Sequence, residues 1–149
     1  MNEKILFENW KSFAEKIKGE FVTEGKYPIH GVNSILEIQK EDQVILRCKL
    51  GKTTEGTFYN WTRVYFYPEG VISENVHIKN TWLNRTFLAS PSDKPILKLL
   101  SSQGASEMVL SKSQSYVQYN RVLFDVEELN AALALSKGIQ EIIMSRQTP

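Results

Sequence analysis

Residues 57–67 read TFYNWTRVYFY and form the most strongly β-prone stretch of the chain. Aromatic and β-branched residues favour strands, and successive side chains of a strand point to opposite faces. The even-numbered positions share one face, namely Phe58, Asn60, Thr62, Val64 and Phe66. The odd-numbered positions share the other, namely Tyr59, Trp61, Arg63, Tyr65 and Tyr67. A proline-initiated turn at Pro68-Glu69-Gly70 then predicts a hairpin with a second strand over 71–79.

Upstream of this stretch, the sequence predicts one helix and three strands. Leu6, Trp10, Phe13 and Ile17 recur at helical spacing, which predicts an amphipathic helix over 3–18 that Gly19 ends. A short strand begins near Phe21, and two more strands are predicted over 34–39 and 43–50. The charged residues 40–42 join these last two strands into a hairpin.

Downstream, two helices flank a further pair of strands. Ser90 and Pro91 predict the start of a helix that runs to about residue 103, where Gly104 ends it. Strands follow over 107–111 and 114–124. Asp125 and Glu128 form a capping box, which predicts a last helix over 126–144 and a frayed tail over 145–149.

The order of these elements predicts an α+β fold. Helix, strands, helix, two strands and helix do not alternate regularly, so we expect an α+β domain of three helices and a mostly antiparallel sheet. The chain has 149 residues, of which 42% are hydrophobic. This length and composition suit one domain over 1–149.

This element order, with its capped pair of helices over 90–103 and 125–144, resembles that of the class I type III secretion chaperones and similar small bacterial domains. The resemblance implies three helices that flank a bent sheet, and a homodimer that cradles an extended segment of a client protein. Such chaperones are usually acidic, whereas this chain has a net charge of +1.

The ionisable and metal-binding residues form no recognisable catalytic pattern. The only histidines, His30 and His77, lack the spacing of a metal site, and Gly51-Lys52-Thr53 lacks the earlier glycine of a phosphate-binding loop. Cys48 alternates in step with Leu46 and is expected in the core, facing away from His77. We therefore predict no enzymatic activity, no metal and no cofactor.

The odd-numbered face of residues 57–67 is the predicted partner-binding site. Its members are Tyr59, Trp61, Arg63 and Tyr65, with Arg47 and Lys49 beside them. Tyrosine, tryptophan and arginine are enriched in protein interfaces. The expected partner is a protein, either a client or a second copy in a homodimer; the alternative for this face is that a helix covers it.

Other functions remain open at this point. An apolar pocket under the sheet would bind a small ligand, and an uncharacterised enzyme is a further possibility. A single-stranded nucleic-acid binder would use Arg47, Lys49 and Arg63 among the aromatic residues, although the near-neutral charge disfavours it. The sequence shows no export signal and no apolar run of about 20 residues, so we expect a cytoplasmic protein that does not enter a membrane.

Overall fold

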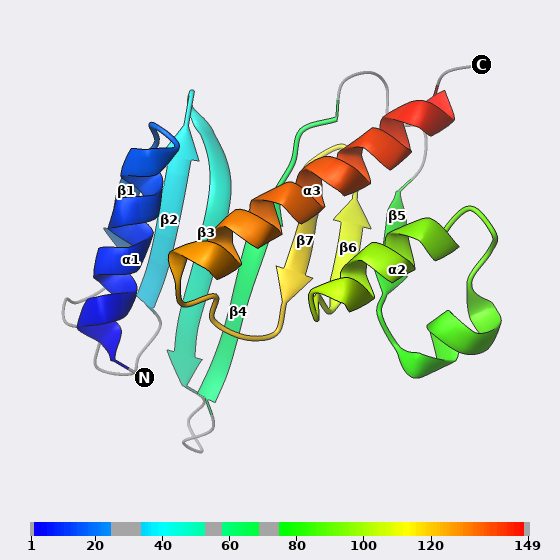
Figure 1. Cartoon of the computed structure of the whole chain (residues 1–149), viewed down its shortest axis with the longest axis horizontal. Helices are drawn as coiled ribbons and strands as arrows, with labels where there is room; N and C mark the ends of the chain where they lie inside the picture. Colours follow the sequence, from blue (N-terminus) through cyan, green and yellow to red (C-terminus); the bar gives the residue numbers. More distant parts are fainter. Residues whose placement is uncertain (1, 25–33, 53–57, 69–74, 148–149) are drawn as a thin grey trace. The chain divides into compact units, whose positions relative to one another are not determined.

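The computed structural model describes residues 2–24, 34–52, 58–68 and 75–147 (Figure 1). Helices and antiparallel strands follow one another in the predicted order, which confirms the α+β class. The helices are α1 (Glu3–Lys16), the short π-helix η1 (Asn84–Leu88), α2 (Lys94–Ser102) and α3 (Val126–Gln147). The strands are β1 (Glu20–Glu24), β2 (Ser34–Lys40), β3 (Gln43–Lys52), β4 (Phe58–Tyr65), β5 (Val76–Lys79), β6 (Glu107–Leu110) and β7 (Tyr116–Tyr119).

The chain divides into two compact units. The first comprises Met1–Arg63 and Asn120–Asn130, and therefore holds α1, β1, β2, β3 and most of β4. The second comprises Val64–Tyr119 and Ala131–Pro149, and holds β5, β6, β7, α2 and most of α3.

In the first unit, β2 and β3 form the hairpin that the sequence predicts. Lys40 pairs with Gln43, so the loop between the strands has only two residues, Glu41 and Asp42. Both have positive φ angles, 53° and 63°. Two-residue hairpin loops favour such angles because the twist of the turn then matches the twist of the strands.

Helix α1 packs against β1 and β2 through its apolar side (Figure 1). Phe7 meets Phe21 of β1 edge to face, with 5.8 Å between the ring centroids. The fully buried side chains of this unit include Leu6, Trp10, Phe13, Leu36, Ile38, Leu46 and Cys48. Burying one such apolar side chain contributes about 1.5–3 kcal/mol, so these residues provide most of the stability of this unit.

The end of α1 places a lysine in a left-handed conformation. The amide of Gly19 donates to the carbonyl of Ala14, and the amide of Lys18 donates to that of Glu15, which is the Schellman pattern. Lys18 has φ 59°, the position at which glycine is usual. Gly19 is required for another reason, because a Cβ there would lie 2.9 Å from the carbonyl oxygen of Gln39.

We expect Lys18→Gly to raise the free energy of unfolding by about 0.5–1 kcal/mol, because glycine adopts positive φ without steric cost. Urea unfolding followed by circular dichroism measures the difference. The matched variant is Gly19→Ala, which we expect to lower stability by forcing a Cβ against the backbone of β2. A loss of stability in Lys18→Gly would contradict this account of the helix end.

In the second unit, the strand order is β7, β6, β5, and the pairs are antiparallel. The hairpin predicted between residues 57–67 and 71–79 is therefore wrong, because β5 pairs with β6. Ile78 lies opposite Met108 in that pair, and both side chains are buried. This apolar match with a strand distant in sequence outweighs the closeness of β5 to β4 along the chain. Residues 69–74, with the predicted turn, lie outside the described residues.

Helix α2 begins at Lys94, three residues after the predicted first helical position Pro91, and residues 91–93 form a turn. Pro95 explains the shift, since proline is tolerated in the first turn of a helix but breaks a hydrogen bond further inside. Helix α3 begins where predicted, and Asp125 Oδ1 accepts a hydrogen bond from the amide of Glu128 at 2.8 Å. It continues to Gln147, past the predicted end at residue 144, and Arg146 lies 3.6 Å from Asp93.

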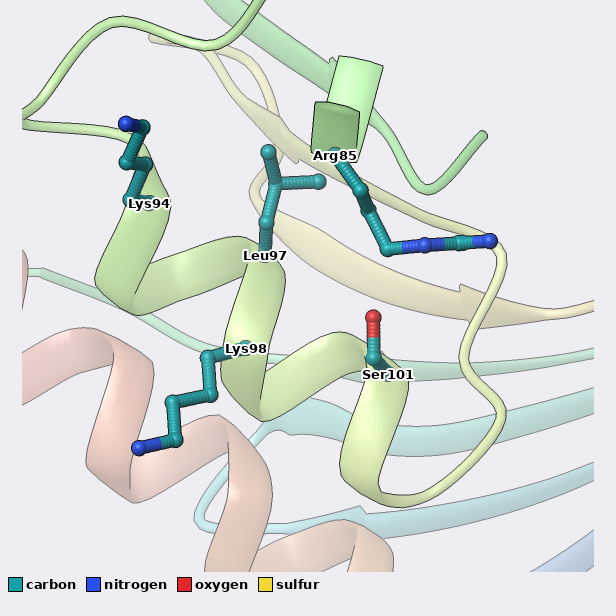
Figure 2. Close-up of a pocket in the computed structure, with 5 residues that line it drawn as sticks. All are labelled: Arg85, Lys94, Leu97, Lys98 and Ser101. Atoms are coloured by element: carbon teal, nitrogen blue, oxygen red, sulfur yellow. The ribbon is translucent and has the colours of Figure 1, made fainter. Parts of the chain in front are cut away.

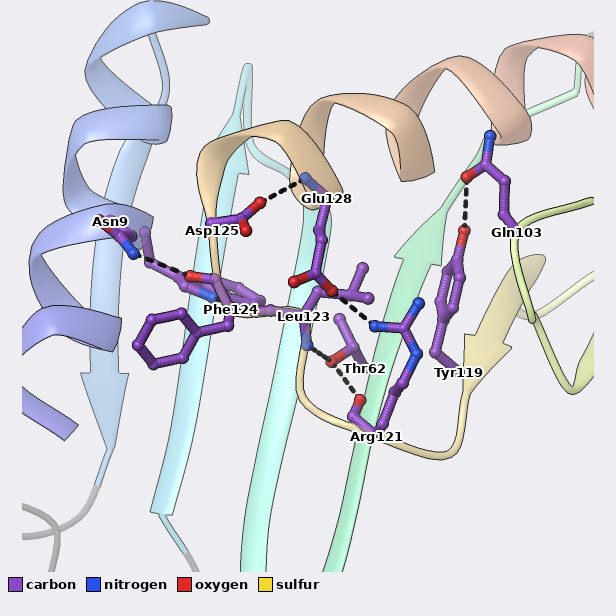
Figure 3. Close-up of polar contacts among 10 residues, drawn as sticks. Asn9, Thr62, Gln103, Tyr119, Arg121, Leu123, Phe124, Asp125 and Glu128 are labelled. Atoms are coloured by element: carbon purple, nitrogen blue, oxygen red, sulfur yellow. Dashed lines mark hydrogen bonds and ion pairs between the residues drawn. The ribbon is translucent and has the colours of Figure 1, made fainter. Parts of the chain in front are cut away.

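Strand β7 ends at Tyr119, whereas the sequence predicted a strand up to residue 124. Residues 120–125 belong to the first unit, where they are held by side chains (Figure 3). Thr62 Oγ1 donates to the carbonyl of Arg121 at 2.8 Å and accepts from the amide of Leu123 at 3.1 Å. Asn9 donates to the carbonyl of Phe124 at 3.2 Å. These bonds satisfy backbone groups that a longer strand would have used.

Candidate protein-binding surface

The structure places the predicted partner-binding residues of β4 in buried positions. Trp61 is 8% exposed and Tyr65 is 7% exposed. In the first unit, the Arg63 guanidinium lies 4.3 Å from the centroid of the Trp61 ring, a cation–π contact. In the second unit, the Tyr65 and Tyr116 rings have centroids 5.7 Å apart. The face that was expected to be open is thus buried at Trp61 and Tyr65.

The other predicted residues are not an open basic surface either. Arg47 Nε lies 3.1 Å from Glu37 Oε2, and Glu37 is buried and also accepts from Gln39 at 2.9 Å. Arg47 and Lys49 are half-buried on β3. The side chain of Tyr59 lies outside the described part of the structure. Trp61 therefore contacts Arg63, and Arg47 pairs with Glu37. Among the described residues of the predicted partner-binding site, no continuous aromatic face is exposed.

A cluster of exposed apolar side chains lies elsewhere, between β5 and α2. Within seven residues, four large apolar side chains are 48–69% exposed, and we call them the apolar patch: Trp82, Leu83, Phe87 and Leu88. The Trp82 and Phe87 rings meet edge to face with centroids 5.7 Å apart. Large exposed apolar clusters on soluble proteins mark interaction sites more often than single exposed residues do.

A local polar framework fixes the backbone that carries the apolar patch. Asn84 accepts at its carbonyl from the amide of Ala89, closing the single π-helical turn of η1. The side-chain Nδ2 of Asn84 donates to the carbonyl of Lys79 at 2.7 Å, and its backbone N–H donates to Thr81 Oγ1 at 3.1 Å. The backbone N–H of Asn80 donates to the carbonyl of Ser106 at 2.8 Å. The polar groups thus hold the turn in place, while the four apolar side chains remain outside the core.

A surface pocket of about 240 Å³ in the same unit is lined in part by Arg85 of η1 (Figure 2). Its lining residues are Arg85, Lys94, Leu97, Lys98 and Ser101. Arg85 Nη1 and Ser101 Oγ both donate to Asn80 Oδ1, at 2.6 and 3.1 Å. Figure 2 shows Arg85 and Ser101 on one side of Leu97, with the ammonium groups of Lys94 and Lys98 extending on the other. Leu97 itself is only 4% exposed, so the groups that the pocket offers to a partner are mainly basic and polar.

The sequence prediction missed the apolar patch. A signal was available, since the pairs Trp82-Leu83 and Phe87-Leu88 lie five residues apart, a spacing that fits neither a helix face nor one side of a strand. Large apolar residues that no regular element can bury together are candidates for exposure.

The remaining reactive side chains form no catalytic arrangement among the described residues. Cys48 is buried, and this burial raises the pKa of its thiol to about 12. His77 pairs with Glu107 across β5 and β6, at a partly exposed position, and His30 lies outside the described residues. In the described part of the chain, no three or more potential ligands gather as a metal site would require.

We expect the Cys48 thiol to resist thiol reagents in the native state, because the reactive thiolate is disfavoured by burial. The unfolded thiol ionises near pH 8.5, whereas the native thiol keeps its proton up to about pH 12. The free energy of unfolding should therefore fall as the pH rises above about 8.5, and Cys48→Ala should remove this component. Fast labelling without denaturant would contradict the assignment.

Each described helix is too short or too polar to span a lipid bilayer. Comparisons of the chain with family models, with curated proteins and with solved structures found no match. The surface of the second unit combines four exposed apolar side chains with a basic pocket.

Proposed function

We propose that the protein is a non-enzymatic protein-binding module and that the apolar patch is its contact surface. The observation that supports this most is the exposure of Trp82, Leu83, Phe87 and Leu88 on a turn with a fixed backbone. Tryptophan in particular is enriched among the residues that contribute most to binding energy at interfaces. A preorganised turn also lowers the entropy that a partner must overcome on binding.

A chaperone-like role belongs to the same proposal. The helix and strand order supports it, because it resembles that of the class I type III secretion chaperones, whose partners are segments of other proteins. A single free cysteine, Cys48, fits a reducing compartment such as the cytoplasm.

Self-association in a homodimer is the second candidate, favoured by the amount of apolar surface left exposed. Sedimentation velocity over a concentration series tests it. If the patch mediates the dimer, the dimer should dissociate in a Trp82→Ser, Phe87→Ser double variant. A monomer at all concentrations would exclude this candidate and leave the binding of another protein.

The protein-binding function is tested by selecting a phage-displayed library of random-sequence short peptides on the wild-type protein. The matched control is the same selection on the Trp82→Ser, Phe87→Ser double variant, which should keep its unfolding midpoint because both side chains are exposed. We expect peptides with apolar residues to be enriched on the wild type alone. Equal recovery on both proteins would contradict the proposed function.

A further inference from the structure

We propose that the segment bound at the apolar patch is acidic as well as apolar, with carboxylates that pair with the basic residues around the pocket. This inference rests on the proposed function, since it names the chemistry of the partner at the same surface. Its first support is local charge. Residues 79–101 contain four basic residues, Lys79, Arg85, Lys94 and Lys98, and one acidic residue, Asp93, which gives +3. The whole chain carries only +1.

The second support is that the basic groups at the pocket have no acidic partner within the described residues. Ion pairs there join carboxylates to Arg47, His77, Arg121 and Arg146, but not to Arg85, Lys94 or Lys98. Asp93, the one acid of the segment, is 3.6 Å from Arg146. These three cations are therefore available to a partner.

The third support is the orientation of Arg85. Its Nη1 donates to Asn80 Oδ1 at 2.6 Å, and Ser101 donates to the same oxygen. A guanidinium has five N–H donors, so this contact fixes the group and leaves donors for a carboxylate. Arginine binds carboxylates through two parallel hydrogen bonds, which gives geometric selectivity that a lysine lacks.

The apolar part of the partner would contact the patch, because Leu97 in the pocket is only 4% exposed. Leu97 separates the side of the pocket with Arg85 from the side with Lys94 and Lys98 (Figure 2). A segment whose apolar side chains contact the patch would bring neighbouring acidic residues to the basic groups of the pocket, because Arg85 of η1 lines that pocket. Lysine stems also cover apolar surface while their charges stay in water, so Lys94 and Lys98 suit such a mixed contact.

Two other occupants fit less well. A second copy bound face to face through a two-fold axis would bring like charges from the two basic pockets close together, which is unfavourable. An anionic membrane would attract the charges, but helices that lie in a membrane interface present a long apolar face, whereas η1 has five residues. An acidic and apolar protein segment satisfies both features of the surface.

The test starts from the peptides that the library selection enriches on the wild type. We expect these peptides to combine apolar residues with an excess of aspartate and glutamate. For one enriched peptide, changing its acidic residues to the corresponding amides should weaken binding about tenfold. Salt at about 0.5 M should weaken it as well, since screening acts on exposed charges.

A charge-matched pair of protein variants tests the same claim from the other side. A triple variant of the pocket should bind the enriched peptide about tenfold more weakly; it carries Arg85→Gln, Lys94→Gln and Lys98→Gln. The control is a triple variant of α1 with Lys4→Gln, Lys11→Gln and Lys16→Gln. It removes the same charge from exposed positions and should leave the affinity unchanged. Equal loss in both variants would show that only net charge matters, and would overturn the inference.

The other outcomes separate the two proposals. Enriched peptides without an acidic excess, or amide peptides that bind as tightly, would overturn the acidic partner and leave the binding function intact. Failure to enrich any peptide over the patch double variant would overturn the proposed function itself. Dimerisation that depends on the patch would assign the surface to a second copy. Binding to phosphatidylserine vesicles that depends on the patch, without peptide binding, would assign it to a membrane. Either result would overturn the inference.

Discussion

Replacing Trp10 by alanine is expected to lower the free energy of unfolding by about 3–5 kcal/mol. The Trp10 side chain is fully buried in α1, and its Nε1 donates to the carbonyl of Leu123 at 2.8 Å. The substitution removes a large apolar side chain and also leaves a buried carbonyl without this donor. Urea unfolding followed by far-ultraviolet circular dichroism measures the change.

Trp10→Phe helps to separate the two contributions, because phenylalanine keeps most of the apolar volume but lacks the Nε1 donor. We expect Trp10→Phe to cost about 1–3 kcal/mol, clearly less than the alanine variant. If Trp10→Ala cost less than about 1 kcal/mol, the side chain would not be part of the core, and the anchoring of residues 120–125 to α1 would be wrong.

Trp61→Ala is also expected to cost about 3–5 kcal/mol, because this side chain is only 8% exposed in β4. The control is Trp82→Ala, which removes the same side chain from a position that is 64% exposed. We expect the control to change stability by no more than about 0.5 kcal/mol. The opposite ranking would return Trp61 to the partner-binding surface that the sequence predicted.

The hairpin of β2 and β3 and the burial of Cys48 follow from local features of the sequence. Alternation places Leu46 and Cys48 on one side of β3, and the charged residues 40–42 leave a short turn as the only connection. The helical spacing of Leu6, Trp10 and Phe13 predicted α1 for the same reason: a regular element with one apolar side buries that side.

Long-range pairing was not predictable in the same way. The partner of β5 depends on β6, which lies about thirty residues further along the chain, and on the buried match of Ile78 with Met108. Alternation in β4 correctly separates Thr62 from Trp61, but it does not show whether the second face is covered. Both side chains are buried, so the expected exposure of Trp61 was wrong.

The apolar patch was missed because it belongs to no long regular element. Sequence patterns identify apolar residues that share a face, whereas the exposure of Trp82 and Phe87 results from a short turn held by Asn80 and Asn84. Such a turn depends on hydrogen bonds to neighbouring strands, which periodicity does not record.

We propose that a protein segment binds over Trp82. Iodide quenching of tryptophan fluorescence tests it directly, because Trp10 and Trp61 are buried and Trp82 is the accessible member of the three. We predict that the enriched acidic, apolar peptide lowers the quenching constant of the wild type as it saturates the protein. A Trp82→Phe variant should show weak quenching with and without peptide. Unchanged quenching of the wild type at saturating peptide would contradict the claim.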